Sequence, residues 1–429
     1  MSAVDTGTGT PSARGLHGLV TAEGISMLGT RMSTLAVPWF VLTSTGSAAA
    51  TGLVAFLETL PLVLAQALGG PAVDRLGPRR VSVATDLLSA VAFGAVPVLH
   101  LLGRLDLVTL GVLVAVCGSA RGLGTTARSV LVPAVTRAAG APLERGAGLH
   151  DGVNRLGTLL GAPLAGVLIA LWSGPAVLLL DAGTFVASAV LVLAVVPQPR
   201  REAAPPAADL EPADSYLGQL RAGLAFLVRD RLLLAIGLMV LVTNLLDQAY
   251  SAVLSPAWVA QVTGSSVTLG LLSGVFGGGA VLGNVLLTWL GPRLPRRRTF
   301  AWSFLVAGAP QYLVMAVTAS ISPVLAVALV RGVGAGSLNP ILGAVEYERI
   351  PPALQARVLG AVSALAWAGI PLGALVAGVA VEHGGLRPTF VVAGAVYLLV
   401  TLAPFVFPAW RGMERGSGQR EDTPAEPVG

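Results

Sequence analysis

Long apolar segments recur along the whole chain, and they constrain its fold more than any other feature. An α-helix needs about 20 apolar residues to cross the hydrocarbon core of a bilayer, which is about 30 Å thick. Windows of that length predict twelve membrane spans and therefore an all-α integral membrane protein. The approximate bounds of the spans are 17–42, 48–72, 80–101, 107–131, 147–171, 175–196, 232–255, 266–290, 299–318, 322–344, 357–381 and 388–408.

The composition excludes a soluble globular fold. Charged residues make up 11% of the 429 residues and hydrophobic residues 54%, whereas about a quarter of the residues in a soluble domain are charged. So few charges could not cover a surface that faces water.

The residues that common catalytic and cofactor sites require are missing or scattered. The chain contains no lysine, so it lacks the lysine-containing glycine-rich loop that binds nucleoside triphosphates. A single cysteine, Cys117, allows no internal disulfide, and the four histidines have no spacing typical of a metal site. No catalytic triad is recognisable. We therefore expect no enzyme activity, no metal and no cofactor.

A proline-rich, charged segment separates the spans into two sets of six. The segment PQPRREAAPPAADLEPADS, residues 197–215, has the composition of a flexible connector. After it, leucines at helical spacing alternate with arginines, which predicts an amphipathic helix lying on the membrane surface. The leucines are Leu217, Leu220, Leu224 and Leu227. The predicted parts are a cytoplasmic tail at 1–16, a six-helix bundle at 17–196, a cytoplasmic linker with the amphipathic helix at 197–231, a second six-helix bundle at 232–408 and a cytoplasmic tail at 409–429.

Short motifs of the first half recur in the second half in the same order. The sequences RGLG, GAPL and LGPRR, which begin at Arg121, Gly161 and Leu76, return as RGVG, GIPL and LPRRR roughly 210 residues later. Parallel repeats of six helices are one architecture of secondary transporters.

The arginines between the spans predict the orientation in the membrane. Loops after odd-numbered spans contain only Arg104 and Arg387, whereas loops after even-numbered spans contain thirteen arginines, not counting those of the amphipathic helix. Because cytoplasmic loops carry the excess of positive charge, both termini are expected in the cytoplasm. The basic residues are spread over many loops, and we expect no nucleic-acid partner. The thirteen are Arg75, Arg79, Arg80, Arg137, Arg145, Arg200, Arg201, Arg293, Arg296, Arg297, Arg298, Arg349 and Arg357.

The loop after the second span contains the segment GGPAVDRLGPRR. It resembles the loop motif of the major facilitator superfamily, except that Pro78 stands where a basic residue is usual. The motif positions are Gly70, Asp74, Arg75, Gly77, Arg79 and Arg80. The segments TSTGSAAATG, TARSVLVPAV and LLLDAGTFVAS resemble the bacterial efflux branch, with its enterobactin-exporter-like and macrolide-efflux-like members. The segment GTLLGAPLAG resembles the antiporter element of the fifth span, with Gly157, Gly161, Pro163 and Gly166.

This resemblance implies a secondary transporter that exports a small organic molecule in exchange for protons. The molecule would be a drug, an antibiotic, a siderophore or another secondary metabolite. The protein would act as a monomer in the cytoplasmic membrane by alternating access, driven by the proton gradient without a cofactor. A proton-coupled importer or symporter of the same fold, and a non-transporting sensor or scaffold, remain as alternatives.

The loop motif predicts a conformational latch. Asp74 can accept charge-assisted bonds from Arg128 or Arg155, which we place near the same face of the membrane. Such a pair would hold the bundles in one state and release them in another. Alternatively, the loop arginines serve only topology. In the second half Pro292 replaces Asp74, so a latch there would be weak or absent.

Ionisable residues within the spans are functional candidates because burying a charge in the bilayer is unfavourable unless it is paired or hydrated. A carboxylate in a dry cavity takes up a proton more readily than one in water, so an acid could couple transport to protons. Alternatively, it could be the permanent partner of an arginine. The candidates for proton coupling or substrate binding are Glu23, Arg31, Glu58, Arg121, Asp181, Asp247 and Arg331, and we expect Asp86 to be structural. The family resemblance links Arg121 in particular to proton handling.

Other polar and aromatic residues within the spans could line a substrate cavity. They are Asn244, Gln248, Gln311, Asn339, Trp39, Phe56, Trp302, Tyr312 and Trp367. For the aromatic residues, packing against lipid or neighbouring helices is the alternative. The small residues of the antiporter-like element are expected to let helices cross closely.

Overall fold

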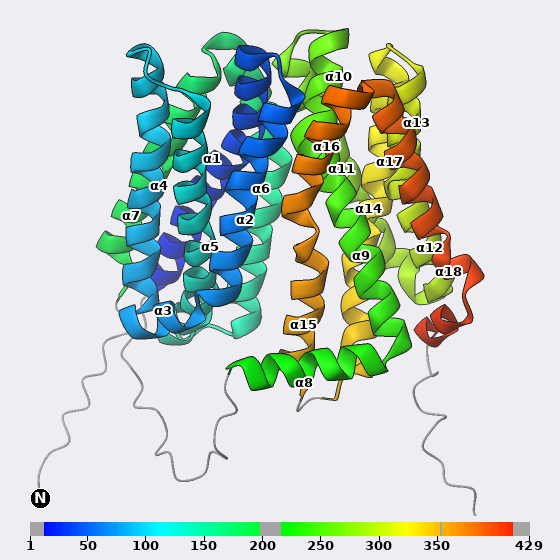
Figure 1. Cartoon of the computed structure of the whole chain (residues 1–429). Helices are drawn as coiled ribbons and strands as arrows, with labels where there is room; N and C mark the ends of the chain where they lie inside the picture. Colours follow the sequence, from blue (N-terminus) through cyan, green and yellow to red (C-terminus); the bar gives the residue numbers. More distant parts are fainter. Residues whose placement is uncertain (1–12, 198–215, 352–353, 415–429) are drawn as a thin grey trace, which may run out of the picture. The chain divides into compact units, whose positions relative to one another are not determined.

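The computed structural model describes residues 13–197, 216–351 and 354–414, and the regular structure in them is helical (Figure 1). The elements are α1 (Ala13–Thr45), α2 (Ala48–Leu68), α3 (Gly70–Leu76), α4 (Pro78–Leu101), α5 (Leu107–Ala138), α6 (Leu143–Leu171), α7 (Gly174–Val195), α8 (Tyr216–Arg229), α9 (Arg231–Ala249), η1 (Tyr250–Leu254), α10 (Ser255–Val262), α11 (Ser266–Leu290), η2 (Gly291–Arg293), α12 (Arg296–Ala307), α13 (Ala309–Val317), α14 (Ile321–Arg349), α15 (Gln355–Ala368), α16 (Ile370–Gly384), α17 (Leu386–Thr401), α18 (Ala403–Val406) and η4 (Pro408–Met413).

The twelve predicted spans and the all-α membrane fold are confirmed. Twelve helical segments in the described residues are long and apolar enough to cross a membrane. Four of them join consecutive elements. These are Arg231–Val262 (α9, η1, α10), Arg296–Val317 (α12, α13), Arg357–Gly384 (α15, α16) and Leu386–Val406 (α17, α18).

Prolines explain where these spans are interrupted. Proline has no amide hydrogen and its ring clashes with the carbonyl one turn earlier. Pro256 follows the π-helical turn η1, and Pro310 follows Gly308, where α12 ends and α13 begins. Pro371 likewise lies in the first turn of α16.

The second span ends earlier than predicted, and a separate short helix follows it. The predicted segment 48–72 is too long, because α2 ends at Leu68 and α3 begins at Gly70. Gly77 ends α3 with a φ of 88°, which a residue with a side chain rarely adopts. The Asp-Arg motif therefore lies on a short helix of its own.

The chain divides into two compact units, Met1–Phe40 with Leu57–Ala207 and Val41–Phe56 with Ala208–Gly429. The bundle boundaries predicted at 17–196 and 232–408 stay predictions. In the first unit α4 packs between α5 and α7. In the second unit α11 packs along α14, where a Cβ on Gly283 would overlap the backbone of Val333. Small residues at this crossing let the two backbones approach closely.

A helix is present where the linker predicts an amphipathic one. In Figure 1, α8 runs across the ends of α9 and α15, and it contacts both helices. Leu227 is buried in a cluster with Leu233 and Val358, whereas Leu224 is exposed. The side chains of Leu217 and Leu220 lie outside the described residues. One apolar side of α8, represented by Leu227, thus packs against α9 and α15.

Candidate substrate and proton site

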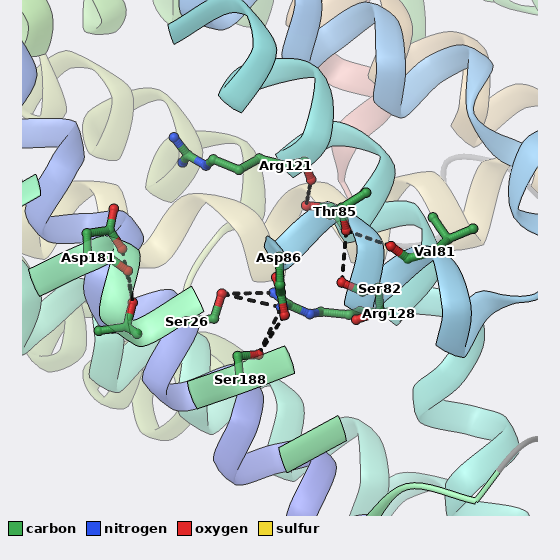
Figure 2. A network of polar contacts seen from close by, with 11 residues as sticks. Ser26, Val81, Ser82, Thr85, Asp86, Arg121, Arg128, Asp181 and Ser188 are labelled. Carbon is green, nitrogen blue, oxygen red and sulfur yellow. Dashed lines mark hydrogen bonds and ion pairs between the residues drawn. The ribbon is translucent and has the colours of Figure 1, made fainter. Parts of the chain in front are cut away.

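A buried polar network joins four helices of the first unit, α1, α4, α5 and α7 (Figure 2). Arg128 of α5 donates to both carboxylate oxygens of Asp86 on α4, at 2.7 and 2.8 Å. The hydroxyl of Ser188 on α7 also donates to Asp86, at 2.7 Å. Ser26 on α1 accepts from Arg128 at 3.3 Å. Asp86 is only 4% exposed, so its charge is balanced by Arg128 rather than by water.

Arg128 therefore has a different partner from the predicted one. The sequence indicates Arg128 or Arg155 as the partner of Asp74, but Arg128 bonds Asp86 and Arg155 bonds Asp151 at 2.7 Å. The sequence could not show this, because the choice depends on helix rotation. Asp74 and Arg75 are exposed on α3, and Arg80 is exposed at the start of α4.

Arg79 and its counterpart in the second half have matching contacts. Arg79 donates to the carbonyls of Leu193 (2.6 Å) and Val192 (3.4 Å) in the last turn of α7. Arg297, in the repeated LPRRR motif, donates to the carbonyls of Pro404 (2.8 Å) and Phe405 (3.1 Å) in α18. The final carbonyls of a helix lack partners within it, so each arginine caps the last membrane helix of its half. The sequence repeat thus corresponds to a repeated structural role.

A second buried ion pair links α2 and α5. Arg121 donates to Glu58 at 2.5 Å, and both side chains are largely buried. The helices cross closely there, because a Cβ on Gly118 would overlap the carbonyl of Glu58. Arg121 also lines a cavity of about 150 Å³ within the first unit, together with Arg31 and Arg128. Two predicted candidates, Glu58 and Arg121, are therefore brought together.

Asp181 is the most completely buried acid among the described residues, with 0% exposure. It lies on α7 against Gly29 of α1, where a Cβ would overlap the carboxylate. The hydroxyl of Thr184 donates to one of its oxygens at 3.0 Å, and the other has no hydrogen-bond partner. No described guanidinium forms an ion pair with Asp181.

Glu23 has a partner that the sequence did not indicate. His150 of α6 lies 2.8 Å from the Glu23 carboxylate on α1. Glu23 is 3% exposed, whereas the side chain of His150 is 37% exposed. The spacing of the histidines along the sequence cannot reveal a pairing across helices. The Glu23–His150 pair is a candidate site that sequence reasoning missed.

The antiporter-like element contacts α1 directly. A Cβ on Gly157 would overlap Met27, and a Cβ on Gly161 would overlap the side-chain stem of Arg31. Pro163 lies within α6, and Gly166 is buried there. The element thus lets α6 approach the face of α1 that carries Arg31.

The second unit contains a comparable site around the repeated arginine. Arg331 of α14 donates to Asp247 of α9 and to the carbonyl of Ala307, both at 2.9 Å. Its guanidinium lies 4.5 Å from the ring centre of Tyr250 and 4.6 Å from that of Phe276. Such cation–π contacts stabilise a partly desolvated arginine.

A cavity of about 180 Å³ adjoins this pair within the second unit, and Asn244 and Asn339 line it. Asn244 also donates to the carbonyl of Ala366 at 2.9 Å. The two amides can therefore offer hydrogen bonds next to the Asp247–Arg331 pair. Both repeat-related arginines, Arg121 and Arg331, consequently line a cavity in their own unit.

Two of the other predicted cavity residues, Tyr312 and Gln311, are packed inside the second unit. Tyr312 is fully buried and donates to the carbonyl of Leu246 at 2.7 Å. Gln311 is also fully buried, on the same helix. Trp302, by contrast, is 58% exposed. In the described parts of the chain, no group of three or more acidic, histidine or cysteine side chains could hold a metal ion.

The chain matches a known protein family over most of its length. Residues 19–249 and 236–428 match the family model described as Major Facilitator Superfamily. The Multidrug efflux pump Tap of Mycolicibacterium fortuitum is 30% identical over 395 residues, which cover 91% of this chain and 94% of that protein. An uncharacterized MFS-type transporter, y4rN of Sinorhizobium fredii (strain NBRC 101917 / NGR234), is 26% identical over 410 residues, covering 92% and 95%.

Solved structures with the same fold cover nearly the whole chain. The nucleoside transporter NupG aligns with a TM-score of 0.74 at 12% identity, over 91% of this chain and 99% of that one. A bacterial homolog of the human lysosomal transporter Spinster, in an inward-facing and unoccupied conformation, aligns with a TM-score of 0.71 at 14% identity, over 94% and 98%. At these identities the likeness concerns the fold alone.

Proposed function

The chain belongs to the major facilitator superfamily, and on that premise we propose that it exports small organic molecules from the cell by proton antiport. Membership in this family makes the chain a multi-pass membrane transporter. The direction of transport is supported by the Tap relatives, which are named multidrug efflux pumps and match over almost their whole length. We propose a drug, an antibiotic, a siderophore or another secondary metabolite as the exported molecule.

The proposed cycle is alternating access by a monomer in the cytoplasmic membrane. The excess of arginine in loops after even-numbered spans supports cytoplasmic termini. Parallel six-helix repeats are typical of transporters that rock about a central site, and the matching caps of Arg79 and Arg297 support such a repeat. The proton gradient would supply the energy, so that no cofactor is required.

The ion pair between Glu58 and Arg121 is the observation that carries the proton-coupling proposal. The two groups lie 2.5 Å apart in membrane-spanning helices, and Arg121 lines the cavity of the first unit. A proton on Glu58 would neutralise the carboxylate and weaken its hold on the guanidinium. Arg121 could then move, which gives the bundle two arrangements that differ by one proton. Proton uptake from outside and release inside would thus drive export.

Asp181 and the Glu23–His150 pair are secondary candidates for the proton. Asp181 is fully buried without a guanidinium partner among the described residues, and Glu23 contacts a histidine, the side chain that most readily titrates near neutral pH. Substituting each acid by its amide separates these sites from Glu58. The site whose amide variant retains substrate binding but loses proton movement is the coupling site.

Export is tested with a resistance and dye-efflux panel in cells that lack their own pumps. The full chain should lower the cellular accumulation of at least one compound, and a protonophore should abolish the effect. Glu58→Gln and Arg121→Gln should both abolish it at an unchanged level of protein in the membrane. Higher accumulation would instead indicate an importer. Lower accumulation that persists in both variants would exclude Glu58 and Arg121 as the coupling site, and no effect of the wild-type chain on any compound would favour a non-transporting scaffold.

We further propose that Asp74 on α3 controls the change of conformation. The short helix ends at Gly77 and leads directly into α4, so a change of its contacts would reach a membrane span. Asp74→Asn should lower turnover with little change in substrate binding. Arg137→Gln, at an exposed residue in the last turn of α5 outside the loop motif, is the control for loss of surface charge. Equal loss of binding and turnover in Asp74→Asn would contradict the latch.

A further inference from the structure

Arg31 occupies an unusual position in the cavity of the first unit. It extends from α1 into a space of about 150 Å³ that is also lined by the hydroxyl-bearing residues Ser26, Thr30 and Ser89. The surroundings are therefore polar, and the hydroxyls could hydrogen-bond to a molecule in the cavity.

The charges around this cavity do not balance. Of its three guanidiniums, that of Arg121 pairs with Glu58 and that of Arg128 pairs with Asp86. Arg31 forms no ion pair with any described residue, and its Nε is buried without a hydrogen-bond partner. The charged group that acts on it most is Arg121, which is also positive. Arg31 is therefore the one guanidinium of this cavity that forms no ion pair with a described carboxylate; Asp181, the unpaired acid of the same unit, does not line the cavity.

An arginine cannot remove this imbalance by losing its proton. Guanidinium stays protonated in proteins, whereas a buried carboxyl can become neutral. A buried unpaired charge in a membrane protein indicates a functional site. We therefore expect its counter-charge to come from a bound molecule. The planar guanidinium fits carboxylates and similar oxyanions with two parallel hydrogen bonds.

The position of Arg31 is also fixed by packing. Gly161 of α6 lies against the first carbons of the Arg31 side chain, so closely that an added Cβ would overlap them. This contact restricts where the base of the side chain can lie. A defined position of the guanidinium reduces the conformational entropy lost on binding a ligand.

We propose that Arg31 binds the acidic group of the transported molecule, so that the substrates are amphipathic organic acids. This inference rests on the proposed export function and names its substrate class. A carboxylate in the cavity would supply the missing negative charge, and the surrounding hydroxyls would bind its remaining oxygen lone pairs. The test distinguishes this substrate class from an inorganic anion that is held permanently at Arg31.

The test measures direct binding to the purified full chain in lipid nanodiscs by fluorescence anisotropy. The probes are fluorescein, which carries a carboxylate, and rhodamine 123, which has a similar ring system but carries an ester and a positive charge. Wild type should bind fluorescein more tightly than rhodamine 123. Arg31→Gln should weaken fluorescein binding about tenfold or more, as expected for the loss of a charge-assisted bond, and leave rhodamine 123 unaffected. Arg31→Lys should recover part of the affinity.

Thermal unfolding without any probe gives a second readout. If Arg31 has no protein partner, Arg31→Gln should leave the unfolding midpoint unchanged or raise it. Arg128→Gln, at a paired arginine of the same cavity, should lower it. If Arg31→Gln lowers the unfolding midpoint as much as Arg128→Gln does, Arg31 has a structural partner and the proposal is overturned.

The remaining outcomes are equally decisive. Fluorescein binding that is absent in wild type, or unchanged in Arg31→Gln, overturns the proposal. Equal binding of both dyes, with chloride or phosphate competing only when Arg31 is present, assigns the site to an inorganic anion and also overturns it. Binding of fluorescein that depends on Arg31, in a chain that exports nothing from cells, supports the anion site and contradicts the export function.

Discussion

Asp86 and Arg128 should not contribute equally to the stability of the first unit. The Asp86→Asn substitution would leave the Arg128 guanidinium, whose side chain is 13% exposed, without a counter-charge. Removing one partner of a buried ion pair costs about 3–5 kcal/mol of unfolding free energy. The Arg128→Gln substitution should cost less, about 1–3 kcal/mol, because Asp86 keeps the bond from Ser188 and can be neutralised by a proton.

The double variant, Asp86→Asn with Arg128→Gln, contains no unpaired charge. It should therefore be more stable than Asp86→Asn alone, and the resulting coupling energy should be at least about 1 kcal/mol, within the range for residues in contact. The unfolding midpoints of the purified variants in detergent, followed by tryptophan fluorescence, give the order of their stabilities.

The exposed pair of Arg155 and Asp151 provides the matched control. It has the same 2.7 Å separation, but its side chains are 52% and 60% exposed. Asp151→Asn should change stability by no more than about 0.5 kcal/mol, as for other surface pairs on one helix. If Asp151→Asn and Asp86→Asn lower the free energy of unfolding equally, the reasoning from burial is refuted. An unchanged midpoint in Arg128→Gln, together with slower transport, would instead favour the role in the loop latch that the sequence indicates.

Three further predictions concern packing, a buried hydroxyl and pH. Gly118→Ala should destabilise the chain by about 1–3 kcal/mol, because its Cβ would overlap the backbone of α2, whereas Gly183→Ala, with open space at the same place, should not; thermal unfolding compares them. Tyr312→Phe should cost about 1 kcal/mol by the same measurement, because it loses a 2.7 Å bond to a carbonyl of α9, and an unchanged midpoint would contradict that value. Hydrogen bonds from Thr109 lower the pKa of Asp106, the exposed residue that caps α5, below its ordinary 3.8. The stabilisation is therefore present above pH 3.8 and lost as the pH falls through the lower folded-state pKa. Hydrogen exchange at the Thr109 amide should show acid-dependent loss of protection in wild type and not in Asp106→Asn; identical profiles would argue against the cap.

The number and placement of the spans could be predicted from the sequence because the length of an apolar segment is a local property. The end of α2 was harder to place, since the residues after Leu68 are still apolar. The actual break depends on how Gly69 and Gly77 bound the short helix α3. A hydropathy window cannot distinguish a continuing helix from a new one in the same apolar stretch.

The charged candidates within the spans could also be found from the sequence, but most of their partners could not. Glu58 and Arg121 are 63 residues apart, and only the rotation and tilt of α2 and α5 bring them together. The same holds for Glu23 and His150. The loop motif identifies Arg79, yet its contact with the end of α7 depends on α4 beginning at the level where α7 ends.

The central claim is that a proton on Glu58 couples transport to the proton gradient. The direct measurement uses proteoliposomes with a trapped pH-sensitive dye, to which the best-exported compound of the efflux panel is added. In wild type the compound should drive a change of internal pH, while Glu58→Gln should still bind the compound and move no protons. Proton movement in Glu58→Gln equal to that in wild type would contradict the account.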